Sequence, residues 1–235
     1  MKIPANEIHI FQSTLEKTSA EIKNSETILS NDELTKAYRY KFEADKNNYV
    51  VCRALLRSVL SEYLSIPAAH ITFFYSEKGK PYINNSSIKF NLAHSNNYTV
   101  FAFVFEEEVG IDIEYQRELR DALTIAKRYF SKSEVEEFEN INSEKIKNAF
   151  FYCWTRKEAF LKAVGEGLSY PLADFSVTLK PGNPKIMWIK KKPDEIKKWS
   201  LHDIKVRENY ISSLAIKSND MKIIYKQIVP SKTFS

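Results

Sequence analysis

A glutamate and a lysine in the stretch "WTRKEAFLKAVGEGL" are spaced so that they could act together on a phosphate group. Glu158 and Lys162 are four residues apart and therefore share one face of a predicted helix. Gly165 and Gly167 follow, and glycine readily takes the left-handed conformation in which helices end. The simpler interpretation is a surface ion pair on an amphipathic helix, and this segment alone leaves that alternative open.

Two acidic residues in "VGIDIE" favour the chemical interpretation. Asp112 and Glu114 point to the same side of a predicted strand, because side chains alternate along a strand. Like charges this close repel, and Mg²⁺, which prefers oxygen ligands and also binds substrate phosphates, would turn the repulsion into a binding site. If Glu158 faces this strand, three carboxylates converge and Lys162 can reach a phosphate that the same ion holds. A half-exposed strand with an acidic wet face is the alternative.

The first part of the chain supplies candidate contacts to an anion. Lys80 lies in the glycine turn "KGKP", where the backbone can approach a ligand, and His94 stands at the end of the strand "FNLAHS". Lys36 and Arg53 lie on two earlier predicted helices. Each of these four could instead be an ordinary solvated charge or a structural hydrogen-bonding group.

Composition indicates a folded protein of one large or two small domains. The chain has 235 residues, 43% of them hydrophobic, and two cysteines without metal-ligand spacing. No apolar run approaches the roughly 18 residues of a membrane helix, and the first residues lack a signal-peptide pattern, so we predict a cytoplasmic protein without membrane contact. The net charge of +5 favours an anionic partner. The basic residues are spread along the chain without an aromatic platform, which argues against nucleic acid.

Hydrophobic periodicity predicts helices and strands in a similar order in both halves of the chain. Ser30 and Glu33 form a capping-box pattern at the start of the first predicted helix. The predicted helical stretches cover about 31–41, 45–64, 119–139 and 143–164, and the predicted strands cover about 70–83, 88–95, 98–105, 109–115, 175–179, 185–190, 199–206, 210–217 and 221–228. We therefore expect an α+β (α/β) protein of two pseudo-duplicated halves, 1–106 and 107–229. Each half would hold a small antiparallel sheet packed with helices, and the tail at 230–235 would be flexible.

The ordered motifs "GKP", "FNLAHS", "VGIDIE", "RYFSKSE" and "WTRKEAFLKAVGEGL" resemble the 4′-phosphopantetheinyl transferases of the surfactin-synthetase-activating type. The likeness covers about residues 30–179. It implies a monomer of two similar α/β halves with coenzyme A bound in the cleft between them. It also implies an enzyme that moves the 4′-phosphopantetheine group of coenzyme A to a serine of an apo acyl or peptidyl carrier protein, releasing adenosine 3′,5′-bisphosphate.

The same resemblance implies roles for single residues. By that likeness the Mg²⁺ ligands are Asp112, Glu114 and Glu158. The likeness also makes Glu158 a candidate base for the carrier serine, acting alone or through a metal-bound water. Lys162 resembles the lysine that contacts the pyrophosphate, and Lys80 and His94 resemble contacts to the adenosine-phosphate end of coenzyme A.

Three positions depart from the family pattern. Ala93 stands where many relatives have serine, so a hydroxyl contact to the coenzyme is expected to be missing. The asparagines at 47–48 stand where an arginine is often found, and Lys36 and Arg53 are the candidates to replace it. Glu134 matches an acidic position of the family, but a capping box with the serine three residues before it is the favoured interpretation.

Two other functions remain open from the sequence. A Mg²⁺-dependent phosphoester or nucleotide hydrolase would use the same carboxylates, and a binding module for acidic carriers or nucleic acid would not need them. For the carrier itself, the segment 116–138 combines basic and apolar residues, which suits an acidic partner with an apolar patch. This segment is the predicted docking surface.

Overall fold

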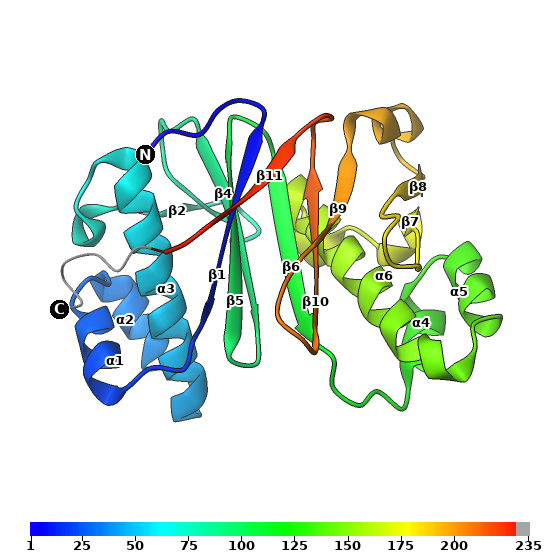
Figure 1. Ribbon diagram of the computed structural model, residues 1–235, viewed down its shortest axis with the longest axis horizontal. Coiled ribbons are helices and arrows are strands. Elements are labelled where there is room, and N and C mark those ends of the chain that lie inside the picture. The colour runs from blue at the N-terminus through cyan, green and yellow to red at the C-terminus, as the bar shows by residue number, and fades with distance from the viewer. Residues whose placement is uncertain (229–235) are drawn as a thin grey trace.

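Two β-sheets pack face to face in this protein, and helices cover their outer sides (Figure 1). The structure is a computed structural model and describes residues 1–228. The predicted flexible tail at 230–235 lies outside the described residues, and so does Val229, the end of the predicted second half.

The first sheet has four strands in the order β11-β1-β5-β4. They are β1 (Glu7–Thr14), β4 (Ile88–Ser95), β5 (Tyr98–Phe105) and β11 (Lys222–Lys226). β1 pairs antiparallel with β5 but parallel with β11, which comes from the far end of the described chain. This parallel pair departs from the expected all-antiparallel sheet, and it covers an edge of β1 that would otherwise expose unpaired backbone groups.

The second sheet has three antiparallel strands in the order β6-β10-β9. They are β6 (Val109–Tyr115), β9 (Ser200–Ile204) and β10 (Tyr210–Ile216). Two short hairpins lie outside the main sheets: β2 (Phe74–Tyr75) with β3 (Pro81–Tyr82), and β7 (Phe175–Val177) with β8 (Ile186–Ile189).

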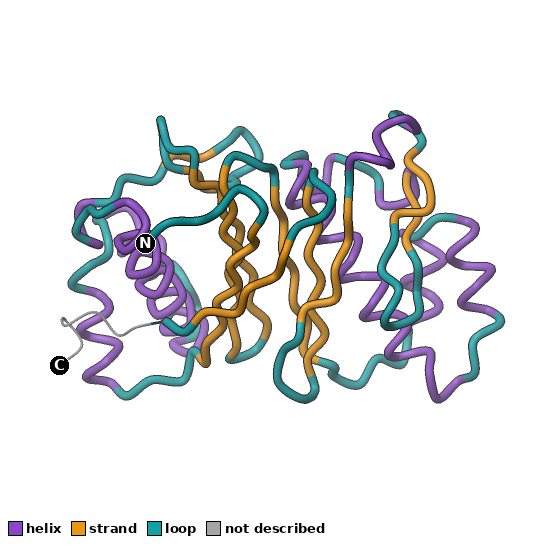
Figure 2. Tube along the Cα trace, turned by 45° about the horizontal axis from the view of Figure 1, so that its top comes forward, coloured by secondary structure: helices purple, strands orange, loops and turns teal. Residues whose placement is uncertain are grey.

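Helices flank the pair of sheets on both sides (Figure 2). In the first half they are α1 (Ser19–Glu26), α2 (Asn31–Ala37) and α3 (Glu43–Leu64), and in the second half α4 (Ala122–Tyr129), α5 (Lys132–Glu139) and α6 (Ser143–Val164). Phe11, Phe101 and Phe103 pack the first sheet against α3, and Ile211 and Ala215 pack the second sheet against the core around α6. Between the sheets lies a separate apolar core.

The two halves repeat one topology, which confirms the predicted pseudo-duplication. The order β1-β5-β4 in the first sheet matches β6-β10-β9 in the second. The covering helices α3 and α6 each have 22 residues. A short helix with a capping box precedes each of them, with Ser30 and Glu33 at α2 and Ser131 and Glu134 at α5, as the sequence predicted.

The capping-box glutamates are buried and each holds a cation from the long helix of its own half. Glu33 accepts hydrogen bonds from Arg53 Nε at 2.6 Å and Arg57 Nε at 2.7 Å. Glu134 lies 2.8 Å from the Lys157 ammonium. Removing one partner from such a buried pair leaves an uncompensated charge, so these residues hold the short helices to the long ones.

β1 and α1 precede the first element that the sequence predicted. β1 is buried on both faces, with Ile8 and Ile10 in the core between the sheets and Phe11 in the core under α3. A strand buried on both sides lacks the alternation by which a half-exposed strand is recognised.

Among residues 1–228, no helix is both long and apolar enough to cross a membrane. Cys52 and Cys153 are buried free thiols.

Candidate functional site

Strand β6 and helix α6 approach each other closely at one point, and this approach builds the site. A side chain on Gly110 would overlap the carbonyl oxygen of Ala159 and the amide nitrogen of Ala163. Only glycine fits such a crossing without a shift of the backbone. Two residues further along β6, Asp112 therefore comes next to Lys162, which lies in the same turn of α6 between Ala159 and Ala163.

Asp112 and Lys162 form the centre of the site. Lys162 Nζ donates a hydrogen bond to Asp112 Oδ1 at 2.7 Å and another to the carbonyl oxygen of Ile111 at 3.2 Å. Asp112 is 6% exposed. Its second oxygen, Oδ2, is buried and has no hydrogen-bond partner within the described residues. A buried carboxylate oxygen without a donor is costly, so this atom indicates a position for a cationic ligand.

Glu158 and Glu114 lie close enough to Asp112 for their charges to interact. Burial, followed by the negative charge of Asp112, raises the pKa of Glu158 to about 7, although Lys162 opposes the shift. Burial and Asp112 also raise the pKa of Glu114, and its hydrogen bond from Ser95 opposes the shift. The charges of Glu158 and Glu114 thus both interact with Asp112 and Lys162, and the convergence of the three carboxylates on one ion stays a prediction.

The donor set of the site fits a hard divalent cation. It consists of carboxylate oxygens, one of them without a partner in the described part of the chain. Mg²⁺ typically takes one or two carboxylates and leaves its other positions to water and phosphate. As they stand, no three His, Cys, Asp or Glu side chains within residues 1–228 form a group that could hold a metal ion. The assignment of Asp112, Glu114 and Glu158 as Mg²⁺ ligands therefore stays a prediction.

A cavity of about 230 Å³ lies beside Lys162, between the two halves. It is lined by the β2–β3 turn, by β4 and by the end of α6, including Lys80, Asn91, Lys162 and Gly165. Gly165 ends α6 in the left-handed conformation, with φ of 81°, as the glycine spacing predicted. A larger cavity of about 360 Å³ adjoins it, and Lys80 and Gly165 line both.

Lys80 crosses from the first half to the second. Its ammonium donates to Glu108 Oε2 at 3.0 Å and to the carbonyl oxygen of Ala163 at 3.2 Å. Lys80 therefore faces the cleft near the end of α6, where the sequence predicted a contact to an anion.

The other predicted contacts divide into two groups. His94 is exposed on β4, and partial desolvation together with the nearby Lys162 charge lowers its pKa. Lys36 is exposed, with its ammonium 5.4 Å from the centre of the Tyr49 ring. Arg53 lies elsewhere: it is 5% exposed and paired with Glu33, so we assign it a structural role in place of the predicted ligand contact.

Comparison with known proteins shows the family of this chain. The model of the 4′-phosphopantetheinyl transferase superfamily matches residues 108–215, and the model of the 4′-phosphopantetheinyl transferase N-terminal region matches residues 13–106. The 4′-phosphopantetheinyl transferase HetI of Nostoc sp. is 31% identical over 90% of this chain and 88% of its own length. This chain belongs to the 4′-phosphopantetheinyl transferase superfamily.

Further relatives of this transferase carry the same activity in their names. The 4′-phosphopantetheinyl transferase Sfp of Bacillus subtilis is 34% identical over 65% of this chain and 67% of its own length. A solved structure, the holo-[acyl-carrier-protein] synthase of Thermotoga maritima, matches 47% of this chain and 62% of its own at 22% identity, with a TM-score of 0.36. The matched regions of the two family models meet between residues 106 and 108, at the turn from β5 into β6.

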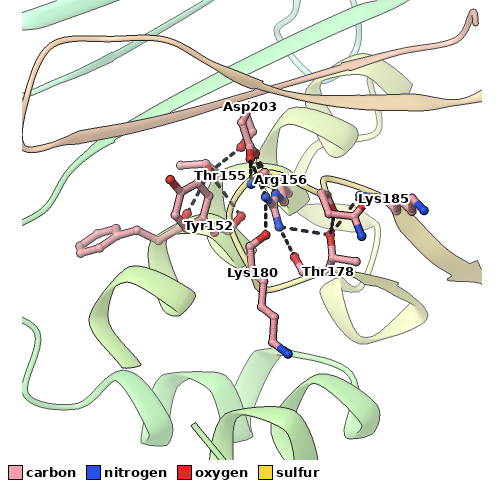
Figure 3. A network of polar contacts seen from close by, with 11 residues as sticks. Tyr152, Thr155, Arg156, Thr178, Lys180, Lys185 and Asp203 are labelled. Carbon is pink, nitrogen blue, oxygen red and sulfur yellow. Dashed lines mark hydrogen bonds and ion pairs between the residues drawn. The ribbon is translucent and has the colours of Figure 1, made fainter. Parts of the chain in front are cut away.

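A buried arginine anchors helix α6 of the transferase to the second sheet (Figure 3). Arg156 on α6 donates to both carboxylate oxygens of Asp203 on β9, at 2.8 Å each. It also donates to the carbonyl oxygens of Thr178 at 2.6 Å and Lys180 at 2.9 Å. This network fixes the rotation of α6 two residues before Glu158.

Replacing Asp203 by asparagine is expected to destabilise the protein without removing its chemistry. The change leaves the Arg156 charge buried without its counter-ion, and such losses cost about 3 kcal/mol at the low end of the measured range. The melting temperature should fall by roughly 6–12 °C, at about 2–4 °C for each kcal/mol in a chain of this size. Calorimetry checks this, with the exposed Asp220→Asn as the control. An unchanged melting temperature would contradict the role of the pair.

Three residues of the cleft escaped the sequence-based predictions. Asn91 and Ser95 on β4 bind β6 across the cleft, and Glu108 pairs with Lys80. Asn91 and Ser95 lie within the motif "FNLAHS", but nothing in their types or spacing names their partners. Only the packing of the two halves creates these contacts.

Proposed function

We propose that this transferase moves the 4′-phosphopantetheine group from coenzyme A to a serine of an acyl or peptidyl carrier protein and requires Mg²⁺. The buried Oδ2 of Asp112, which has no hydrogen-bond partner among residues 1–228, carries the proposal, because it offers an anionic oxygen next to the Lys162 ammonium, which could bind a phosphate. The printed names of the relatives support the transferred group. Adenosine 3′,5′-bisphosphate is the second product.

Asp112, Glu114 and Glu158 would hold the Mg²⁺ ion in this proposal. A bound Mg²⁺ ion supplies charge neutralisation for the pyrophosphate of coenzyme A. Lys162 contacts the same pyrophosphate from the end of α6, and Lys80, His94 and Lys36 contact the adenosine-phosphate end.

Glu158 and Lys162 have different roles in the transfer: Glu158 is the base, and Lys162 stabilises negative charge. Glu158 accepts the proton of the carrier serine hydroxyl at its carboxylate, and its raised pKa of about 7 suits a base that works near neutral pH. The serine oxygen then bonds to the phosphorus that carries the pantetheine. The bond from that phosphorus to the bridging oxygen breaks, and adenosine 3′,5′-bisphosphate leaves with the electron pair. Lys162 stabilises the charge that develops on the bridging oxygen.

Intact mass spectrometry of an apo carrier protein tests the proposal. The protein is incubated with Mg²⁺, coenzyme A and the carrier, with Glu158→Ala in parallel. A gain of roughly 340 Da on the carrier, lost in the variant, is expected for one phosphopantetheine group. Release of free pantetheine phosphate without any gain on several unrelated carriers would instead indicate a hydrolase, and the proposal would fail.

Glu108→Gln is expected to tighten coenzyme A binding. Glu108 competes with a phosphate for the Lys80 ammonium, and it is half exposed, so the competition is modest. Exposed pairs contribute about 0.2–1 kcal/mol, which corresponds to a dissociation constant lower by a factor of roughly 1.5–5. Titration calorimetry with coenzyme A measures this, and Lys80→Met should weaken binding. Weaker binding by Glu108→Gln would contradict the competition.

The segment 116–138 stays our proposed docking surface for the carrier, on a protein that we propose is monomeric and cytoplasmic. Its arginines at 117, 120 and 128 are exposed. The division into halves at 106 and 107 is likewise a proposal, and β11 returns to the first sheet across it.

Arg128→Glu is expected to raise the KM for an acidic carrier about tenfold with little change in kcat, because a like charge at the rim of an interface slows association. Steady-state kinetics at low and high salt measures the effect. Arg39→Glu, an exposed reversal on the first half, is the matched control. An unchanged KM would exclude Arg128 from the docking surface.

A further inference from the structure

The two halves are joined at the cleft by side chains in place of a main-chain ladder. β4 and β6 belong to different sheets but lie side by side. The amide of Ile111 donates to Asn91 Oδ1 at 2.9 Å, and the amide of Tyr115 donates to Ser95 Oγ at 3.0 Å. Asn91 and Ser95 are four residues apart on β4, as are Ile111 and Tyr115 on β6. The two hydrogen bonds therefore act as clamps at the two ends of the β6 segment that carries the acidic residues.

The two clamps differ in what they reach on β6. Asn91 binds a main-chain amide, whereas Ser95 also donates its hydroxyl proton to Glu114 Oε2 at 2.9 Å. A hydroxyl has a single proton, and the Tyr115 amide already occupies one acceptor position of Ser95 Oγ. The hydroxyl is therefore directed at Glu114, and one oxygen of that carboxylate stays free for another partner.

The hydrogen bond from Ser95 matters because two nearby charges favour other positions of the Glu114 carboxylate. The negative charge of Asp112 repels it, and the largely exposed Arg117, at 3.9 Å from Oε2, attracts it toward solvent. A glutamate side chain that must be ordered at the moment of binding loses rotamer entropy then, and a hydrogen bond made beforehand removes part of that cost.

We propose that Ser95 is a positioning residue for the cation site: it holds Glu114 from across the cleft, so that the first half sets the geometry of a ligand in the second half. This inference rests on the proposed function, since it concerns the same cation. Asn91, which holds β6 without touching a carboxylate, gives a matched comparison.

Binding of Mn²⁺, followed by the electron paramagnetic resonance signal of the free ion, tests the role of Ser95 without relying on turnover. Ser95→Ala is expected to weaken Mn²⁺ binding about tenfold, as is typical when the partner of a metal ligand is removed. Ser95→Thr keeps the hydroxyl and should restore the affinity. Asn91→Ala removes the other clamp and should lower the melting temperature while Mn²⁺ affinity stays within about twofold of wild type. In transfer assays, Ser95→Ala should need about tenfold more Mg²⁺ for half-maximal rate, with the KM for the carrier unchanged.

Distinct outcomes separate this inference from the proposed function. If the wild-type protein transfers phosphopantetheine and binds Mn²⁺, but Ser95→Ala binds Mn²⁺ equally well, the inference fails and the proposed function stands. Equal losses of affinity in Ser95→Ala and Asn91→Ala would also overturn it, because strand placement and not the hydroxyl would then be responsible. If the wild-type protein neither binds Mn²⁺ nor transfers the group, the proposed function fails and the inference fails with it.

Discussion

Asp112→Asn is expected to lower the rate of phosphopantetheine transfer about a thousandfold while the protein keeps its fold. Asparagine has the shape of aspartate but cannot offer a second anionic oxygen or a counter-charge for Lys162. A metal contributes several kcal/mol of charge stabilisation, and about 4 kcal/mol corresponds to a thousandfold in rate. The measurement is kcat/KM for the carrier at saturating Mg²⁺ and coenzyme A.

The melting temperature shows whether this loss is chemical. Burial raises the pKa of Asp112, which means that the ionised carboxylate costs stability there, and the neutral amide relieves that cost while Lys162 loses its partner. The two effects on the free energy of unfolding oppose each other, and each kcal/mol shifts the melting temperature by about 2–4 °C in a chain of this size. We therefore expect the melting temperature of Asp112→Asn to lie within a few degrees of wild type. Asp203→Asn makes the same chemical change outside the cleft and should show the reverse pattern, with lower stability and near-normal turnover of the folded fraction. Activity of Asp112→Asn within tenfold of wild type would contradict the central role of Asp112.

Gly110→Ala is expected to have the largest effect on both stability and activity among changes outside the charged residues. A methyl group there would overlap main-chain atoms of Ala159 and Ala163, which cannot rotate away. Overpacking of this kind costs about 3 kcal/mol or more, so the melting temperature should fall by roughly 6–12 °C or the protein should not fold. In any folded fraction β6 must move away from α6, and a misplacement of about 1 Å is enough to lower the rate about a hundredfold.

Gly182→Ala is the matched control for this prediction. Gly182 has φ of 77°, but open space surrounds its missing side chain. The change should cost only about 1 kcal/mol of backbone strain and leave transfer unchanged. If Gly110→Ala melted and turned over like Gly182→Ala, the close approach of β6 and α6 would not be what builds the site.

Much of this fold depends on local sequence and was predictable for that reason. Helix α6 was predicted at 143–164 and is found at Ser143–Val164, because its apolar spacing and its glycine stop are both local signals. The capping boxes at α2 and α5 depend on residues only three positions apart. The shared face of Asp112 and Glu114 follows from the alternation of a strand, and the motif order was enough to indicate the family.

What sequence alone could not decide are contacts between distant segments. Arg53 and Lys80 were both predicted from the sequence as contacts to an anion. In the structure Arg53 is buried against Glu33, whereas Lys80 faces the cleft. β11 pairs in parallel with β1, more than 200 residues earlier in the chain, which no local pattern marks.

The site itself shows most clearly what depends on tertiary contacts. Local patterns were enough to predict the chemical types, an acidic strand and a Glu-Lys helix face. Only the close crossing at Gly110 brought those two elements together, and only the packing of the halves set Ser95 against Glu114. The physical reason is that periodicity and capping act within a few residues, whereas the charge environment of a buried carboxylate depends on every segment packed around it.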